Sequence, residues 1–117
     1  MNRPVNPRAI ELPWPSSKLS GHNNGAWHHK SGTVKAHRLL ACKEAEKLGL
    51  RVLSDDDIRV RVDFFRPDKR GDRINFPNRM KPYFDGIADA LEVNDSRFVP
   101  EYHFHDGEKP GMVRVTL

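Results

Sequence analysis

Cysteine is almost absent from this sequence, and so are long apolar runs. A single cysteine, Cys42, among 117 residues excludes a disulfide within the chain and indicates a reducing compartment such as the cytoplasm. No apolar run approaches the roughly 20 residues that cross a bilayer, so we expect no membrane partner. The first ten residues lack the apolar stretch of a signal peptide, which agrees with that expectation. We expect Cys42 to be a buried, small apolar residue on a helix and not a nucleophile.

Several catalytic signatures are missing as well. The sequence has no serine–histidine–acid arrangement, no glycine-rich phosphate loop and no cysteine–histidine zinc spacing. Two histidine pairs remain. His103 and His105 are expected on one face of a strand, where such pairs are solvated more often than they bind a transition metal. The adjacent His28 and His29 are expected to contact DNA or to be merely polar.

Positive charge is concentrated in one part of the chain. The net charge is +4, which permits a polyanionic partner. One segment holds eight basic residues against three aspartates, and the remainder is close to neutral. Such clustering favours a track for the phosphates of a nucleic acid. The eight are Arg59, Arg61, Arg66, Lys69, Arg70, Arg73, Arg79 and Lys81.

Hydrophobic periodicity predicts one domain over residues 1–117, with residues 1–9 as a flexible arm. Strict alternation over 58–64 predicts a half-buried strand with Arg59, Arg61 and Asp63 on its polar face. The expected elements are a strand at 10–12, a loop over 18–30, a helix over 31–48 ended by Gly49, the strand at 58–64, a basic loop over 66–75, a helix over 76–91, and strands near 98–104 and 113–117. This order predicts an α+β (mixed α/β) fold, a small single-layer sheet packed by two helices.

Two acidic residues frame the second helix. Asp72 ends the basic loop and Asp95 follows the helix. A helix of about sixteen residues spans about 24 Å, so the two carboxylates meet only if the helix is shorter, is kinked at Pro82 or packs against a partner chain. Carboxylates within a basic region suit a Mg²⁺ ion that hydrolyses phosphodiesters. The alternative is that Asp72 caps the helix and Asp95 closes a turn.

Two further features leave alternatives open. Asp85 and Asp89 are four residues apart on one helix face, where they either share a cation or pair with Lys81 and Arg79. Trp27 either stacks on an unpaired base or packs in the core.

Five segments resemble RusA-like Holliday-junction resolvases of the phage and prophage branch. Asp72-Arg-Ile-Asn75 falls where that family has an Asp-x-Asp-Asn motif. The others, in order and at the family's spacing, are Leu12-Pro-Trp-Pro-Ser-Ser-Lys-Leu-Ser20, Trp27-His-His-Lys30 with Val34-Lys-Ala-His-Arg38, Lys81 with Asp85-Gly-Ile-Ala-Asp-Ala-Leu91, and Asn94-Asp95-Ser96.

The resemblance covers roughly residues 10–117 and implies a homodimeric, cytoplasmic endonuclease of a bacterial or phage-infected cell. Such enzymes bind four-way DNA junctions and cut them symmetrically with Mg²⁺, and Mn²⁺ is a possible substitute. By position, Asp72 matches the first metal-binding aspartate, Asp95 the last and Asn75 the motif's asparagine. Lys81 matches the catalytic lysine, and Asn78 occupies the other slot that this lysine takes in some branches.

One position departs from the family pattern. Ile74 stands where the family has its second aspartate, and an aliphatic side chain cannot bind a metal. Either another oxygen replaces it, or one metal suffices at a lower rate, or the protein binds DNA without cutting. The candidate replacements are Asp68, Asn75, Asp85 and Asp89.

The expected function is therefore a Mg²⁺-dependent endonuclease of branched DNA. The alternatives are a branched-DNA-binding protein without cleavage and a basic protein-interaction module. The residues expected to contact DNA are Lys18, Lys30, Arg59, Arg61, Lys69, Arg70, Arg73 and Arg79.

Overall fold

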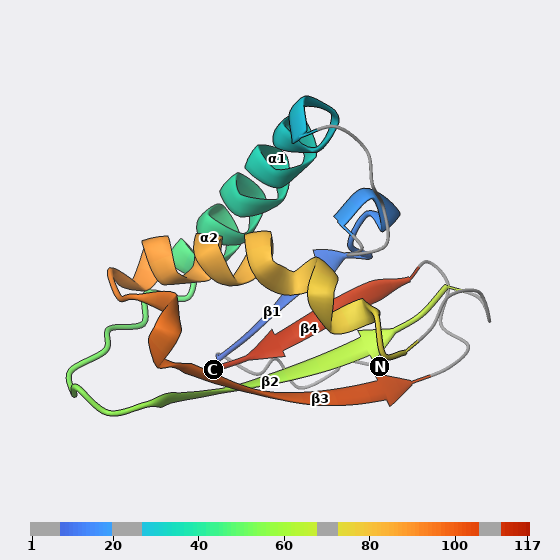
Figure 1. The fold of residues 1–117 in the computed structure, drawn as a ribbon. Coiled ribbons are helices and arrows are strands. Elements are labelled where there is room, and N and C mark those ends of the chain that lie inside the picture. Colours follow the sequence, from blue (N-terminus) through green and yellow to red (C-terminus); the bar gives the residue numbers. More distant parts are fainter. Residues whose placement is uncertain (1–7, 20–26, 68–72, 106–110) are drawn as a thin grey trace.

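A computed structural model describes residues 8–19, 27–67, 73–105 and 111–117, and of residues 27–30 it describes only the backbone. Figure 1 shows a twisted sheet with both long helices on one of its faces. The elements in chain order are β1 (Ala9–Pro13), η1 (Ser17–Leu19), α1 (Trp27–Glu46), β2 (Ile58–Phe65), η2 (Phe76–Met80), α2 (Lys81–Leu91), η3 (Asp95–Arg97), β3 (Phe98–His105) and β4 (Met112–Thr116), where η marks a 3₁₀ helix. The predicted mixed α+β fold, with a small sheet and two helices, is confirmed.

The sheet has four strands in the order β1-β4-β2-β3. β2 runs parallel to β3, and the other neighbours are antiparallel. Val62 at the centre of β2 lies opposite Tyr102 of β3 and Val115 of β4. β1 and β3 are therefore the two edges of the described sheet, and β2 and β4 lie between them.

The two faces of the sheet follow the alternation of the sequence. Val60, Val62 and Phe64 of β2 are buried against the helices, as the pattern predicts. Ile87 of α2 and Phe76 of η2 belong to the same core. The opposite face carries the odd-numbered side chains of β2 and is not covered by α1 or α2 (Figure 1).

The two helices pack closely at Gly86. A Cβ atom there would collide with the carbonyl oxygen of Arg38 and would lie 3.0 Å from the Cβ of Ala41. A larger residue at position 86 would therefore push the helices apart. On the exposed side of the same contact, the Arg38 guanidinium forms two hydrogen bonds with Asp89, at 2.7 and 2.8 Å.

The first helix begins earlier than the sequence predicts. α1 starts at Trp27 and not at residue 31, so the end of the predicted 18–30 loop is helical. Residues 27–30 contain no proline or glycine to prevent helix formation, and the loop was expected from the Gly, Asn, His and Ser content of residues 18–30 as a whole. After α1, Gly49 adopts a φ of 63°, which fits its predicted role as the stop signal.

The predicted helix over 76–91 is two elements. A 3₁₀ helix precedes α2, and Pro82 lies in the first turn of α2, where proline needs no hydrogen-bond donor. Glu92 ends α2 in the left-handed region, with a φ of 56°, and its N–H bonds to the carbonyls of Ala88 and Asp89. α2 is thus 11 residues long, and the chain reverses immediately after it.

The N-terminal arm is shorter than predicted where the structure describes it. Ala9 belongs to β1 and pairs with Thr116 of β4. Arg8 and Leu117 exchange backbone and side-chain hydrogen bonds of 2.9 and 2.6 Å. Residues 8 and 9 are therefore part of the sheet's edge, while residues 1–7 lie outside the described part of the chain.

Candidate active site

The left-handed Glu92 reverses the chain after α2, and the reversal brings the Asp95 carboxylate to the ammonium group of Lys81. The Lys81 ammonium group forms an ion pair with Asp85, with a distance of 3.0 Å between Nζ and Oδ1. The same group also forms an ion pair with Asp95. We call these three residues the Lys81 cluster. Two carboxylates share one ammonium group, so the cluster carries a net negative charge.

The Lys81 cluster lies at the surface. The side chain of Lys81 is 65% exposed, and those of Asp85 and Asp95 are 23% and 29% exposed. The hydrogen bond from Lys81 lowers the pKa of Asp95, although partial burial opposes this, and a hydrogen bond with Asp85 adds to the lowering. Hydrogen bonds to Asp95 and Asp85 raise the pKa of Lys81. These contacts favour the charged forms of Lys81 and Asp95, and all three side chains are within reach of solvent.

Two of the predicted catalytic residues, Lys81 and Asp95, are thus brought together. The expected separation of about 24 Å concerned a different pair, Asp72 and Asp95. It assumed a helix of about sixteen residues, whereas α2 has 11 and is followed by a reversal. Asp72 lies outside the described residues, and so does Asp68. Asn75 is half-buried just before η2, where its carbonyl accepts the Asn78 N–H at 3.2 Å.

Ile74, the departure from the family motif, is at the surface. Its side chain is 81% exposed, so this apolar residue is not part of the core. Among the proposed replacements, Asp89 is bound to Arg38 of α1 and is not in the Lys81 cluster. Asp85 and Asp89 therefore do not share a cation site. Of the two predicted pairings, Asp85 with Lys81 is confirmed, whereas Arg79 contacts neither aspartate and donates to the Pro15 carbonyl.

The predicted DNA-binding residues do not form one continuous track in the described part of the chain. Arg59 and Arg61 lie on the sheet face opposite the helices. Lys18 is exposed on η1. Arg73 precedes η2 and Arg79 belongs to it, on the helix side of the sheet. Lys69 and Arg70 lie outside the described residues, as does the side chain of Lys30. The positive charge of the sequence segment is thus divided between two faces.

A second charged cluster on the sheet was not predicted. Asp63 is only 5% exposed, although it lies on the face without helices. It accepts two hydrogen bonds from Arg61, at 3.0 and 3.2 Å, and one from Nε2 of His105 at 2.8 Å. Burial raises the pKa of Asp63, but the hydrogen bonds from Arg61 and His105 outweigh it, so the pKa is below its ordinary value. We call these residues the Asp63 cluster.

The two strand histidines have separate partners. His103 bonds to Glu101 at 2.9 Å, and the His105 ring stacks on Phe65 at 4.5 Å while bonding to Asp63. Among the described residues, no group of three or more histidine, cysteine or acidic side chains could hold a metal ion. The sequence could not reveal the Asp63 cluster, because it depends on β3 lying beside β2: the register sets Asp63 opposite His103 and Phe65 opposite His105, and the His105 side chain reaches diagonally to Asp63.

Cys42 is less buried than predicted. It is half-buried on α1, and its Sγ lies 3.3 Å from Oε1 of Glu46. Burial raises the pKa of the thiol, and the bond to Glu46 adds to this effect. The neutral thiol is therefore favoured, which agrees with the expectation that Cys42 is not a nucleophile.

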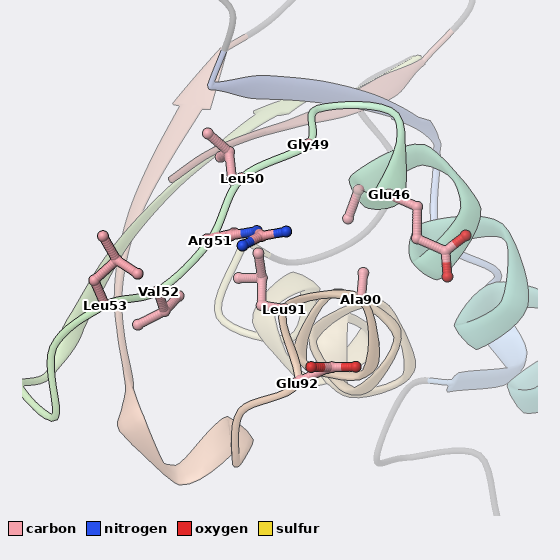
Figure 2. Close-up of a pocket in the computed structure, with 10 residues that line it drawn as sticks. Glu46, Gly49, Leu50, Arg51, Val52, Leu53, Ala90, Leu91 and Glu92 are labelled. Atoms are coloured by element: carbon pink, nitrogen blue, oxygen red, sulfur yellow. The ribbon is translucent and has the colours of Figure 1, made fainter.

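A surface pocket of about 700 Å³ lies between the end of α2 and the segment after α1. Figure 2 shows its walls, which come from the end of α2 at Ala90 and Leu91 and from the segment after α1 at Leu50 and Arg51. None of the described residues that line it belongs to either charged cluster. Within the described residues, no helix is long and apolar enough to span a membrane.

Comparison with known proteins identifies a relative but no described activity. No family model matches the chain. A protein of Xylella fastidiosa (strain Temecula1 / ATCC 700964), described as an uncharacterized protein, is 35% identical over 115 residues. The match covers 94% of this chain and 75% of the relative. At this identity and coverage, the chain belongs to the same family as the Xylella protein.

Proposed function

We propose that this protein is a metal-dependent endonuclease of branched DNA, similar to RusA-like resolvases and acting as a homodimer on four-way junctions. The observation that carries the proposal is the Lys81 cluster, in which two accessible carboxylates share one lysine. The family resemblance independently matches Lys81 and Asp95 to a catalytic lysine and a metal-binding aspartate. The basic composition of the chain suits a DNA substrate.

The two carboxylates of the Lys81 cluster suit a hard divalent cation. Mg²⁺ takes one or two carboxylates and completes its shell with water and phosphate oxygens. Asp85 and Asp95 supply that number, and Asp72 is a third candidate outside the described residues. When bound, the ion would activate water and neutralise charge that develops on the phosphate.

Asp85 is the residue that we assign to replace the aspartate missing at Ile74. It lies one helical turn after Lys81 and shares that lysine with Asp95. Of the other candidates, Asp89 is held by Arg38, and Asn75 brings a neutral amide. Asp85 therefore restores negative charge beside Asp95, which a neutral amide would not do.

Lys81 has two tasks in this proposal. Before substrate binds, its ammonium group holds Asp85 and Asp95 together, although like charges repel. Its side chain is long and 65% exposed, so the ammonium can turn to a phosphate oxygen when the carboxylates take other partners. A positive charge there would stabilise the charge that develops on the phosphate during cleavage.

A second candidate is a branched-DNA-binding protein without cleavage activity. The exposed Ile74 favours it, because nothing in the core requires an apolar residue at that position. At such an exposed position, a metal-binding aspartate can be replaced without loss of stability. A protein that only binds DNA does not need that aspartate. A basic protein-interaction module is a third and weaker candidate, since no observed feature favours it.

Cleavage of a labelled four-way junction tests the proposal. The junction and a linear duplex of the same sequence are incubated with protein in Mg²⁺, Mn²⁺ or chelator. We expect paired nicks in the junction alone, only with a divalent ion. Retarded but uncut junction in every condition would instead establish the binding protein, and the absence of any retardation would favour the interaction module.

A further inference from the structure

Arg79 is an arginine without a counter-ion in the described part of the chain. Its Nη1 donates to the Pro15 carbonyl at 3.3 Å, and its guanidinium lies over the Phe76 ring, 5.3 Å from the centroid. Its Nε is buried and has no hydrogen-bond partner. Burial of this charge lowers the pKa of Arg79, and no neighbouring carboxylate among the described residues offsets that effect. A partly buried guanidinium in this state gains more from an anion than a solvated one does.

Residues 13–16, which include the Pro15 carbonyl that accepts the bond from Arg79, are held in place by contacts with several elements. The Tyr83 hydroxyl donates to the Pro13 carbonyl at 2.7 Å, and the Trp14 ring packs edge-on against Phe76 at 4.9 Å. The Ser16 N–H bonds to His37 of α1 at 3.2 Å. Arg79 therefore lies against a fixed frame, and binding an anion there requires little ordering of the protein.

Negative charge is absent from the two sequence segments that meet at this place. Residues 12–43 and 73–84 contain no aspartate or glutamate. η1 and η2, which belong to these segments, contact each other, and η1 presents the exposed Lys18. Such a surface attracts anions, and these two segments contribute no carboxylate that would compete for the guanidinium.

We infer that Arg79 is the centre of a phosphate-binding site between η1 and η2, which takes one phosphodiester group of a DNA backbone. The inference rests on the proposed function for the identity of the substrate. It adds that Arg79 differs from the exposed arginines, since it is held in place before DNA binds. Lys18 would add a second, more mobile charge at the rim. Arg79 is thus a substrate-positioning residue, separate from the Lys81 cluster.

The salt dependence of DNA binding tests this inference. Junction affinity is measured for the wild type, Arg79→Met and Arg79→Lys. The salt concentration is varied from about 50 to about 200 mM, a range over which the loss of phosphate contacts changes the affinity measurably. We expect Arg79→Met to weaken binding about tenfold and to reduce the slope of log affinity against log salt by about one. Arg79→Lys should keep the slope, because it keeps the charge, but lose affinity. Arg51→Met removes an exposed arginine at the pocket of Figure 2 and is the matched control.

The outcomes separate this inference from the proposed function. If Arg79→Met and Arg51→Met have the same slope and affinity, Arg79 is only a structural residue and the inference is wrong, even if the junction is cut. A reduced slope only in Arg79→Met supports the inference, even if no junction is cut. Wild-type protein that fails to bind DNA overturns both. Thermal stabilisation of the wild type but not of Arg79→Met by inorganic phosphate, without DNA binding, would assign the site to a free phosphate and overturn the DNA assignment.

Discussion

The Asp63 cluster on the sheet and the Lys81 cluster beside α2 contain the same kinds of side chain in opposite proportions. In the Asp63 cluster, one buried carboxylate accepts hydrogen bonds from an arginine and a histidine. In the Lys81 cluster, two partly exposed carboxylates share one lysine. The first carboxylate has its hydrogen-bonding capacity largely filled. The other two retain excess negative charge and access to solvent.

This difference teaches how to separate structural from functional charge in a small domain. A buried carboxylate must keep its partners, because an uncompensated charge in the interior is costly. An exposed pair of carboxylates gains little stability from its lysine and can exchange it for another cation. The Asp63 cluster should therefore determine stability, and the Lys81 cluster should determine activity. Three experiments test this division.

The largest effect is expected for Asp95→Asn. Removing this charge should lower Mg²⁺-dependent junction cleavage by a factor on the order of 100 or more while leaving junction binding and the melting temperature nearly unchanged. Asp85→Asn should also lower cleavage if Asp85 replaces the aspartate missing at Ile74. Single-turnover cleavage rates and thermal melts provide the measurements.

Asp57→Asn is the matched control, since Asp57 is exposed and lies before β2. Full activity of Asp95→Asn would show that the Lys81 cluster is not the cleavage site. An inactive Asp95→Asn beside a fully active Asp85→Asn would remove only the assignment of Asp85.

The next largest effect is expected for Asp63→Asn, on stability. Loss of the charge weakens the hydrogen bonds from Arg61 and His105 and leaves the amide facing the guanidinium. The free energy of unfolding should therefore fall by about 1–3 kcal/mol. Urea unfolding measures this change, with Asp57→Asn again as the control at about ±0.5 kcal/mol. Cleavage at a temperature where both proteins are folded should be unchanged. A loss of activity without a loss of stability would contradict the division between the clusters.

The smallest effect concerns acid. The pKa of Asp63 is lower in the folded protein than in the unfolded chain, so its contribution to stability is present above about pH 4 and is lost as the pH falls through the folded value. The stability difference between wild type and Asp63→Asn should therefore narrow below about pH 4. Urea unfolding from pH 7 to pH 3 measures it. A difference that stays constant over this range would show that Asp63 stabilises the sheet by packing and not by charge.

Much of the fold could be predicted from the sequence, because local periodicity reports which face of an element is buried. The alternation over 58–64 predicted β2 and its polar face, and the stripe over 76–91 located the second helical region. Pro82, a candidate kink within that region, instead lies in the first turn of α2, where proline is favoured. The start of α1 was missed because the composition of residues 18–30 as a whole favours a loop, and composition does not locate the first turn of a helix.

The charged clusters depend on contacts that no local pattern records. The sequence alone determined which carboxylates flank the second helix, the single thiol and the concentration of basic residues. Only the tertiary structure placed Asp95 beside Lys81, because the left-handed Glu92 reverses the chain after a short helix. Only the pairing of β3 with β2 brought the His105 side chain within reach of Asp63, and only helix packing placed Asp89 beside Arg38. A sequence fixes the charges that are available, whereas their partners are set by how distant segments pack together.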